Sequence, residues 1–524
     1  MGESRLSEGM LLRSLIGLVL VCFCWGTEIA AAEGPRVKPA APPVSLIDQA
    51  LADLSSEDQS TQEAAVLFLS ERGDPSLLLK LEAIRDSADR SVRLALKPLM
   101  DQLKNRINLS SPDVDQRRSA AADLGSAGKP GAIPWLAAAL ENEPHRWVRY
   151  AIEESIALLQ LASTNPDDQI TAATKLGELR SQNAVPALKE LLQQGSDGSA
   201  TAQHQAVASA ARAAIEQIDI WASWAGAFET IFRGISLSSI LLIMSLGLAI
   251  VFGLMGVINM AHGELMMVGA YATFVTQECF KAYLPPGAFD YYFLVSMPVS
   301  FLVAAVFGLI LEATVISFLY GRPLETMLAT WGVSLVLIQA ARVYFGDLTS
   351  VVAPSWLSGG VQAMVGVYLP YNRIFIILLS ILCVCGIYFL LFRTGIGLRV
   401  RAVTQNRDMS SCLGIPTRKV DAYTFAFGSG LAGVAGCALT LIGNVEPGLG
   451  QNYIVDSFMV VVTGGVGKLM GTIVASLGIG GLNKLLEPSF GAVYSKVLIL
   501  VLVVVFLQRR PSGLFTIKGR HADT

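Results

Sequence analysis

Charge is scarce in this sequence, and its scarcity limits the class of protein. Only 15% of the 524 residues are charged, whereas 52% are hydrophobic, a balance too apolar for an ordinary soluble protein. It indicates a membrane protein whose main partner is the lipid bilayer. The formal net charge is only −3 and no basic domain or stripe stands out. We therefore expect no nucleic-acid partner, because binding to phosphate backbones needs a concentrated positive surface.

Cysteine is absent from residues 33–221. This segment can therefore form neither a disulfide framework nor a cysteine metal site. Elsewhere, Cys22 and Cys24 lie in the first apolar stretch, and the remaining cysteines lie in or beside later apolar runs. Cys383 and Cys385 are too few to complete a tetrahedral metal site alone.

Motifs for catalysis, nucleotide binding and metal binding are missing as well. The stretch GGVGKLMGT at 464–472 contains Gly-Lys, but Leu469 stands where a phosphate loop needs Ser or Thr. His262 and Glu264 are two residues apart and point to different sides of a helix, which does not suit a metal pair. Cys412 has no neighbouring histidine. We therefore expect no enzyme activity, no cofactor and no metal in this chain.

The first residues resemble a secretory signal. Arg5 and Arg13 precede an apolar core of signal length, and small residues follow at 30–32. This pattern predicts a signal peptide over residues 1–32, with a retained anchor helix as the alternative. In either case the segment that follows is exported to the periplasm.

Residues 33–221 are expected to form an exported array of helices. RRSAAADLGSAGKPGAIPWLAAAL at 117–140 and QITAATKLGELRSQNAVPALKELL at 169–192 match in register, and a weaker copy covers 62–84. Each copy is followed by a second run with helical periodicity. A helix pair that recurs every 50-odd residues is typical of a HEAT-type solenoid. Its role, protein docking or a stabilising spacer, stays open.

Residues 222–515 read as a transmembrane bundle of about eight to nine helices. The runs are longer than barrel strands and do not alternate, so helices are the only plausible spanning form. The expected spans are 235–255, 262–278, 292–320, 326–344, 372–392, 421–442, 453–466, 471–485 and 492–508; whether both short segments, 453–466 and 471–485, cross the membrane stays open. The expected fold class is thus all-α, a polytopic transmembrane helical bundle preceded by an exported HEAT-like repeat domain.

Basic residues fix the expected orientation. If the array is periplasmic, nine spans leave the tail at 516–524 in the cytoplasm. The loops then predicted to lie inside carry most of the basic residues, as the positive-inside rule requires. These residues are Arg322, Arg393, Arg399, Arg401, Arg407, Arg418, Lys419, Lys468, Arg509, Arg510, Lys518 and Arg520. The protein is therefore expected in the bacterial inner membrane, with its N-terminal domain outside.

A polar cluster interrupts the first apolar region. In GVINMAHGELMMVGAYATF at 256–274, the residues Asn259, His262 and Glu264 fall between two spans. The topology places this break near the inner face, so we interpret it as a structural or gating hinge, with Gly263 supplying the bend. Direct contact with a solute is the alternative. Glu312 lies within a span and is expected to face the interior, in a hydrogen bond or ion pair, or along a pathway.

The longest inner loop contains an apolar stripe. Leu398, Ala402, Met409 and Leu413 are predicted on one helical face, and Gly414 is a helix stop. Such a helix could lie on anionic lipid or insert into a groove on a partner.

Several of these motifs resemble one family. RAVTQNRDMSSCLGI at 401–415 resembles the coupling segment of permeases in the urea and branched-chain amino acid family of ABC importers. GLAIVFGLMGVINMAHGELMMVGAYA at 247–272 resembles the first membrane signature of that family. The exported extension and four further stretches are more similar to the urea-type branch than to the amino-acid branch. The stretches are GRPLETMLATWGVSLVLIQAARVYFG, PSWLSGG, LPYNRIFII and GNVEPGLGQNYIVDSFMVVVTGGVGKLMGT.

The resemblance implies a permease subunit that moves urea by alternating access, together with a second related permease, two cytoplasmic ATPase subunits and a periplasmic substrate-binding protein. The implied ATPase-coupling residues are Arg401, Ala402, Gln405, Asn406, Leu413 and Gly414. Two alternatives stay open: a branched-chain amino acid or short-amide permease of the same family, and a membrane scaffold or receptor that transports nothing.

Overall fold

The computed structural model describes residues 46–54, 61, 64–65, 68–69, 77–87, 90–196 and 201–515. The predicted signal peptide at 1–32, the tail at 516–524 and much of the weak repeat copy at 62–84 lie outside these residues. The chain divides into two compact units, Met1–Ala127 and Gly128–Thr524.

The first unit is helical. Its core is formed mainly by leucines, among them Leu69, Leu81 and Leu99, which are fully buried. Its described helices are α2 (Leu46–Asp53), α4 (Leu77–Ser87), α5 (Arg90–Asn108) and α6 (Val114–Ser126). Asp113 caps α6, because its side chain accepts a hydrogen bond of 3.0 Å from the amide of Asp115.

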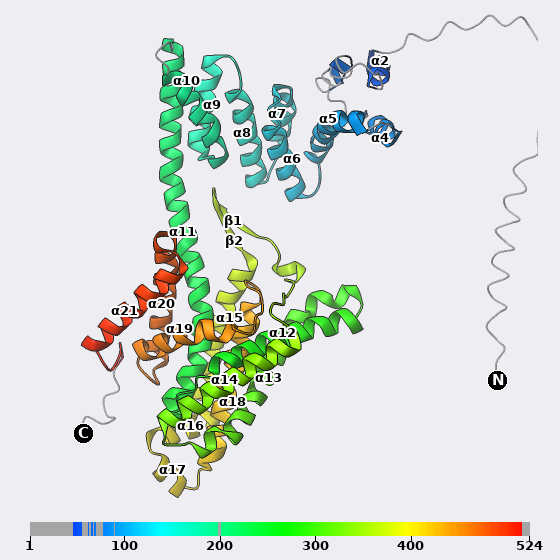
Figure 1. Cartoon of the computed structure of the whole chain (residues 1–524). Coiled ribbons are helices and arrows are strands. Elements are labelled where there is room, and N and C mark those ends of the chain that lie inside the picture. The colour runs from blue at the N-terminus through cyan, green and yellow to red at the C-terminus, as the bar shows by residue number, and fades with distance from the viewer. Residues whose placement is uncertain are drawn as a thin grey trace, which may run out of the picture. The chain divides into compact units, whose positions relative to one another are not determined.

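The second unit begins with further helices of the predicted array (Figure 1). These are α7 (Ile133–Asn142), α8 (Arg146–Leu161), α9 (Pro166–Leu179), α10 (Val185–Ser196) and the first part of α11 (Ala202–Met255). The repeat copy at 169–192 folds as α9, a short 3-10 turn at Gln182–Ala184, and α10. Alanine and leucine faces such as Ala172, Leu176 and Leu188 are fully buried between the helices. The all-α class and the HEAT-like packing are thus confirmed.

Helix α11 joins the array to the membrane bundle without a linker. It has 54 residues and, at 1.5 Å per residue, is about 80 Å long. The domain boundary that the sequence suggested at residues 221 and 222 lies inside this helix. Figure 1 shows α11 passing from the array into the bundle as one continuous helix.

A tryptophan on α11 fixes a contact between the array and the membrane part. The Trp221 indole donates a hydrogen bond of 2.9 Å to the carbonyl of Val365. Val365 lies at the tip of an antiparallel hairpin formed by β1 (Gly360–Met364) and β2 (Val367–Pro370). The guanidinium of Arg180, whose φ of 58° places it in the left-handed region, stacks 3.8 Å above the indole ring.

The membrane bundle contains nine helices within the described residues. They are α11, α12 (His262–Tyr283), α13 (Tyr292–Thr314), α14 (Pro323–Phe345), α15 (Tyr371–Arg393), α18 (Thr417–Leu439), α19 (Leu449–Gly464), α20 (Leu469–Phe490) and α21 (Ala492–Arg509). Seven are long and apolar enough to cross a membrane; α12 and α19 are not among them. With 16 residues, α19 is shorter than the roughly 20 that a crossing needs.

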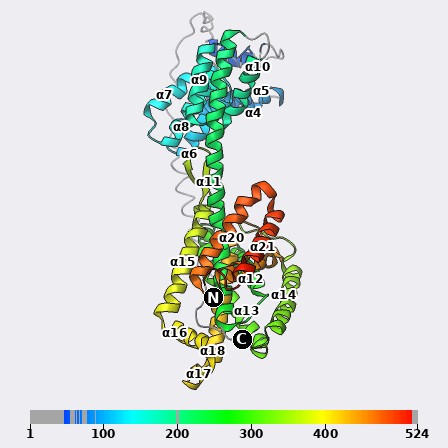
Figure 2. The ribbon, with the colours of Figure 1, turned by 90° about the vertical axis from the view of Figure 1, so that its left-hand side faces the viewer.

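The helices of the bundle pack in two sets, one along α18 and one along α11. Helices α13 and α12 pack along α18, α20 and α19 pack along α11, and α12 and α19 also pack against each other. Figures 1 and 2 show α20 and α21 on one side of α11, and α13 and α14 on the other side. Helices α14, α15 and α21 keep exposed apolar side chains such as Val336, Phe389 and Val501. These faces suit lipid or a partner subunit.

We predict that Trp221→Ala destabilises the junction between α11 and the hairpin. The substitution removes both the ring under Arg180 and the donor to the Val365 carbonyl, so the thermal unfolding midpoint of the purified chain should fall. Trp224→Ala is the matched control, since Trp224 lies on the same helix and is 71% exposed. Equal midpoints for the two variants would contradict the structural role of this contact.

Candidate translocation and coupling sites

The break between α11 and α12 is formed by residues 256–261. Helix α11 ends at Met255, and Gly256 caps it with a left-handed φ of +69°. Asn259 shapes the loop by accepting a hydrogen bond of 3.0 Å from the Ala261 amide. The amide of Met260 donates to the Thr330 hydroxyl at 3.1 Å, which ties the loop to α14.

The bend therefore lies at Gly256, and the sequence-based assignment to Gly263 needs correction. Gly263 is already helical, in the first turn of α12. It is needed there for a different reason: a methyl group on it would approach the carbonyl oxygen of Gly450 to 2.6 Å. Gly450 lies in the first turn of α19, so the N-termini of the two helices meet backbone to backbone.

Three polar side chains are buried around this contact. Asn259 and His262 are fully buried, and Glu264 is 1% exposed. His262 Nε2 lies 3.2 Å from the carbonyl oxygen of Met244 on α11. Because a carbonyl only accepts, Nε2 carries the proton in this contact. Glu264 Oε1 accepts a hydrogen bond of 2.8 Å from the Ser334 hydroxyl on α14.

Each of these three side chains also carries an atom without a hydrogen-bond partner within the described residues: Asn259 Nδ2, His262 Nδ1 and Glu264 Oε2. An unsatisfied buried polar atom costs about 1–3 kcal/mol, so proteins keep such atoms where water, a ligand or a second conformation satisfies them. The cluster can thus offer an amide donor and a carboxylate acceptor to a small polar solute.

The helix termini add a directional field to the cluster. Glu264 occupies the first turn of α12, and the N-terminus of α19 faces it across Gly450. Both termini carry partial positive charge, which stabilises an anionic group. Paired half-helix N-termini inside a bundle are also where transporters bind the carboxylates of their substrates.

Glu312 does not join this cluster. It is buried on α13, as expected for an interior-facing residue, and interacts electrostatically with Asp421 and Arg418. Its Oε1 has no hydrogen-bond partner in the part of the chain that the structure describes. Glu312 therefore belongs with the coupling segment at the start of α18.

The predicted coupling helix is two helices. Helix α16 (Gly395–Gln405) and α17 (Arg407–Cys412) are separated by Asn406, which is extended and caps α17 by accepting from the Met409 amide at 2.9 Å. The expected single apolar face is therefore wrong: Leu398 and Ala402 lie on α16, whereas Met409 lies on α17 and Leu413 follows it. Leu398 and Leu413 are nonetheless 61% and 76% exposed. Gly414 has a φ of +82°, which confirms the predicted helix stop.

Both short helices are fastened to membrane helices. Arg407 pairs with Asp421 on α18 at 2.5 Å and lies over the Tyr320 ring. Arg401 lies 5.2 Å from the ring centre of Phe392 on α15. Asp421 lies in the first turns of α18 and is buried, so this ion pair balances its charge. Ala402 is half-buried in α16, and Gln405 is exposed at its end.

Sequence inspection missed the contribution of α14. Thr326, Thr330 and Ser334 are buried and recur every fourth residue, so they form one polar stripe. Thr330 bonds the α11–α12 break at Met260, and Ser334 bonds Glu264 in the first turn of α12. That spacing is visible in the sequence and identifies a helix face turned towards polar groups.

The family model described as the permease component of branched-chain amino acid transport systems matches residues 230–507, more than half of the chain. The chain belongs to this family. A model of the PBS lyase HEAT-like repeat matches residues 168–194, which form α9 and α10.

Three curated relatives align with the membrane part. The high-affinity branched-chain amino acid transport permease BraD of Pseudomonas aeruginosa is 28% identical over 292 residues, which cover 55% of this chain and 94% of the relative. The probable branched-chain amino acid permease LivH of Methanocaldococcus jannaschii is 27% identical, covering 53% and 89%. The high-affinity permease LivH of Escherichia coli is 26% identical, covering 55% and 94%.

The protein is thus a multi-pass membrane permease component of an ABC transporter, and the resemblance seen in the sequence is confirmed for the family. The urea-type branch is not supported, since these relatives are described as permeases for branched-chain amino acids. The alternative substrate class named from the sequence fits the matches better.

We predict that Gly263→Leu disrupts the contact between the N-termini of α12 and α19, because any side chain there meets the Gly450 backbone. Transport should be lost, with a lowered unfolding midpoint. Gly332→Leu on α14 is the control, since a methyl group at Gly332 meets no atom within 4 Å. Wild-type uptake by the Gly263→Leu variant would rule out the close approach.

Proposed function

We propose that this chain moves a branched-chain amino acid across the inner membrane by alternating access. The observation that carries the proposal is the match along nearly the whole length of permeases described for that substrate class. A second related permease, two ATPase subunits and a periplasmic binding protein complete the proposed transporter.

The polar cluster supports a zwitterionic solute over urea. The Glu264 carboxylate complements an ammonium group, and the paired N-termini of α12 and α19 complement a carboxylate. Urea has neither an ammonium nor a carboxylate group to place opposite these charges. In this proposal the cluster is closed in the present conformation, where Gly263 touches Gly450, and opens when α12 and α19 separate.

The coupling segment supports the proposed link to separate ATPases. Leu398, Met409 and Leu413 expose apolar surface beside basic residues, which suits insertion into a groove on a soluble partner. We place the N-terminal array in the periplasm, where it faces the binding protein, and the C-terminus in the cytoplasm.

The substrate is tested by uptake of labelled leucine and labelled urea in a strain that lacks this chain, with and without the wild-type copy. Leucine uptake should be lost in the deletion strain and restored by the wild-type copy. Excess unlabelled urea should not reduce the uptake of labelled leucine. Restored urea uptake with unchanged leucine uptake would contradict the proposed substrate.

We predict that Glu264→Gln raises the KM for leucine roughly tenfold or more, because hydrogen bonds to charged groups contribute about 1.5–3 kcal/mol. Glutamine keeps the size of the side chain and can still accept from Ser334. Glu278→Gln is the control: Glu278 lies on the same helix but is exposed and pairs only with its neighbours Lys281 and Gln277. An unchanged KM in the Glu264 variant would exclude direct contact with the solute.

Arg401→Ala combined with Gln405→Ala should abolish transport while membrane insertion stays intact. The reason is that both residues lie on α16, the proposed ATPase contact. Arg399→Ala on the same helix serves as the control. Uptake and the amount of co-purified ATPase subunits are measured together. Normal uptake in the double variant would remove α16 from the coupling interface.

A further inference from the structure

A slot of about 840 Å³ lies between α11, α15, α16 and α20, away from the polar cluster. Most of its lining is apolar, from residues such as Leu246, Cys385, Phe389 and Met470. Phe389 is 62% exposed and Met470 is 64% exposed, so the slot opens on the surface of the bundle. The volume lies within the range of about 300–1,000 Å³ that is typical of ligand pockets.

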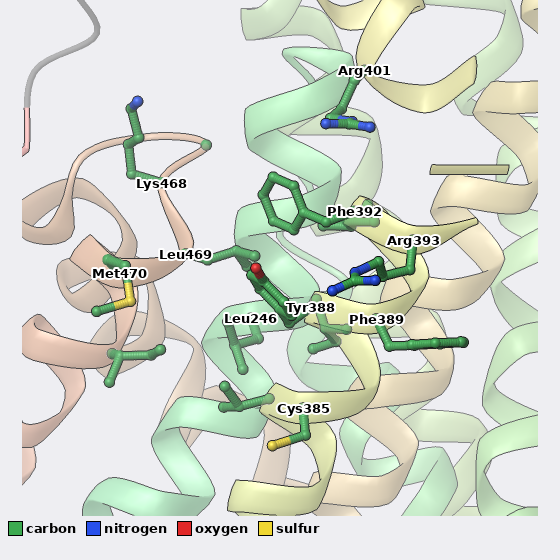
Figure 3. A pocket seen from close by; sticks show the side chains of 15 residues that line it. Leu246, Cys385, Tyr388, Phe389, Phe392, Arg393, Arg401, Lys468, Leu469 and Met470 are labelled. Atoms are coloured by element: carbon green, nitrogen blue, oxygen red, sulfur yellow. The ribbon is translucent and has the colours of Figure 1, made fainter. Parts of the chain in front are cut away.

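One end of this slot is basic. Arg401 from α16 and Lys468 from the turn before α20 lie there, and Arg393 from the end of α15 lies further along the slot beside Phe389 (Figure 3). Figure 3 shows Arg401 and Lys468 at one end of the slot and Cys385 and Leu246 at the other. The slot is therefore amphipathic along its length.

The three cations lack a carboxylate partner. Among the described residues none of them forms an ion pair, whereas Arg322 pairs with Glu325 and Arg407 pairs with Asp421 nearby in the chain. The Arg401 guanidinium lies over the Phe392 ring. It also donates a hydrogen bond of 3.4 Å to the Gly397 carbonyl in its own helix. Unpaired positive side chains that line one slot favour an anionic occupant.

These features define the chemistry of an occupant. It carries a negative headgroup and a long apolar tail, and it reaches the slot from the membrane. All three basic residues belong to the segments that the charge bias places at the cytoplasmic face, where anionic lipids attract basic pockets between helices. We propose that the slot binds one anionic phospholipid, with its phosphate among Arg393, Arg401 and Lys468 and an acyl chain along the apolar wall.

The consequence for the transporter follows from the elements involved. The lipid touches α16 through Arg401 and both α15 and α20 through their cytoplasmic ends. It therefore fills the space beside the proposed coupling helix and supplies a negative charge to the basic side chains that line the slot. The site is distinct from the solute cluster and does not rest on the identity of the solute.

The test uses the full chain, purified in detergent and exchanged into discs made of phosphatidylcholine with phosphatidylglycerol, followed by native mass spectrometry of retained lipid. Wild-type protein should retain one phosphatidylglycerol in preference to phosphatidylcholine. Arg393→Gln with Lys468→Gln should lower retention roughly tenfold or more, because each basic side chain near an anionic headgroup adds to the affinity. Arg401 is left intact so that coupling is not disturbed.

The control is Arg399→Gln with Arg509→Gln, which removes the same charge at exposed positions outside the slot. It should retain lipid as the wild type does. A tail-specific variant, Cys385→Trp, fills the apolar end and should also lower retention, whereas Leu382→Trp at an exposed neighbouring position should not.

Three outcomes would overturn the proposal. The first is equal retention in the charge variant and its control. The second is displacement of the lipid by soluble glycerol phosphate, which would assign the basic end to a free phosphate. The third is loss of the lipid when the second permease subunit co-purifies, which would assign the slot to a subunit interface.

Discussion

The close approach of backbones at glycine positions is the constraint on which the bundle depends. Gly263 meets Gly450 where α12 and α19 begin, and Gly247 meets Gly428 where α11 crosses α18. Without hydrophobic driving force between helices in lipid, association relies on such close packing. The glycines let α12 be held against α18, and let the 16-residue α19 be held against α11. Neither helix is among the seven candidate spans.

That arrangement explains how polar groups are tolerated at membrane depth. The irregular segment 256–261 is covered by α14, whose hydroxyls bond to Met260 and Glu264. Irregular backbone is permitted in a membrane protein only where protein or water surrounds it. The same cover leaves three side-chain atoms unsatisfied, and in the proposed function these are the atoms that the cluster offers to a solute.

The sequence predicted most of the elements because their signals are local. Long apolar runs and helical periodicity predicted the nine helices of the bundle, and Gly414 predicted a helix stop. Features that depend on tertiary contacts were not predictable in this way. Asn406 splits the coupling helix because its side chain caps α17, and Asp421 pairs with an arginine 14 residues earlier in the chain. The continuity of α11 past residue 221 was also not predicted. The composition becomes apolar after that residue, but the helix does not end there.

The split coupling segment gives the proposed mechanism a physical route. Helix α17 is tied to α18 through Arg407 and Asp421, while α16 packs against α15 through Arg401 and Phe392. A partner that moves these helices therefore acts on two membrane helices at once. Of the two, α18 packs along both α12 and α13, and Gly436 on it lies against the Met266 carbonyl on α12. Displacement of α18 must shift α12, because no side chain or void separates their backbones at that point. The contact between Gly263 and Gly450 is thereby the place where motion at the coupling end would open the polar cluster.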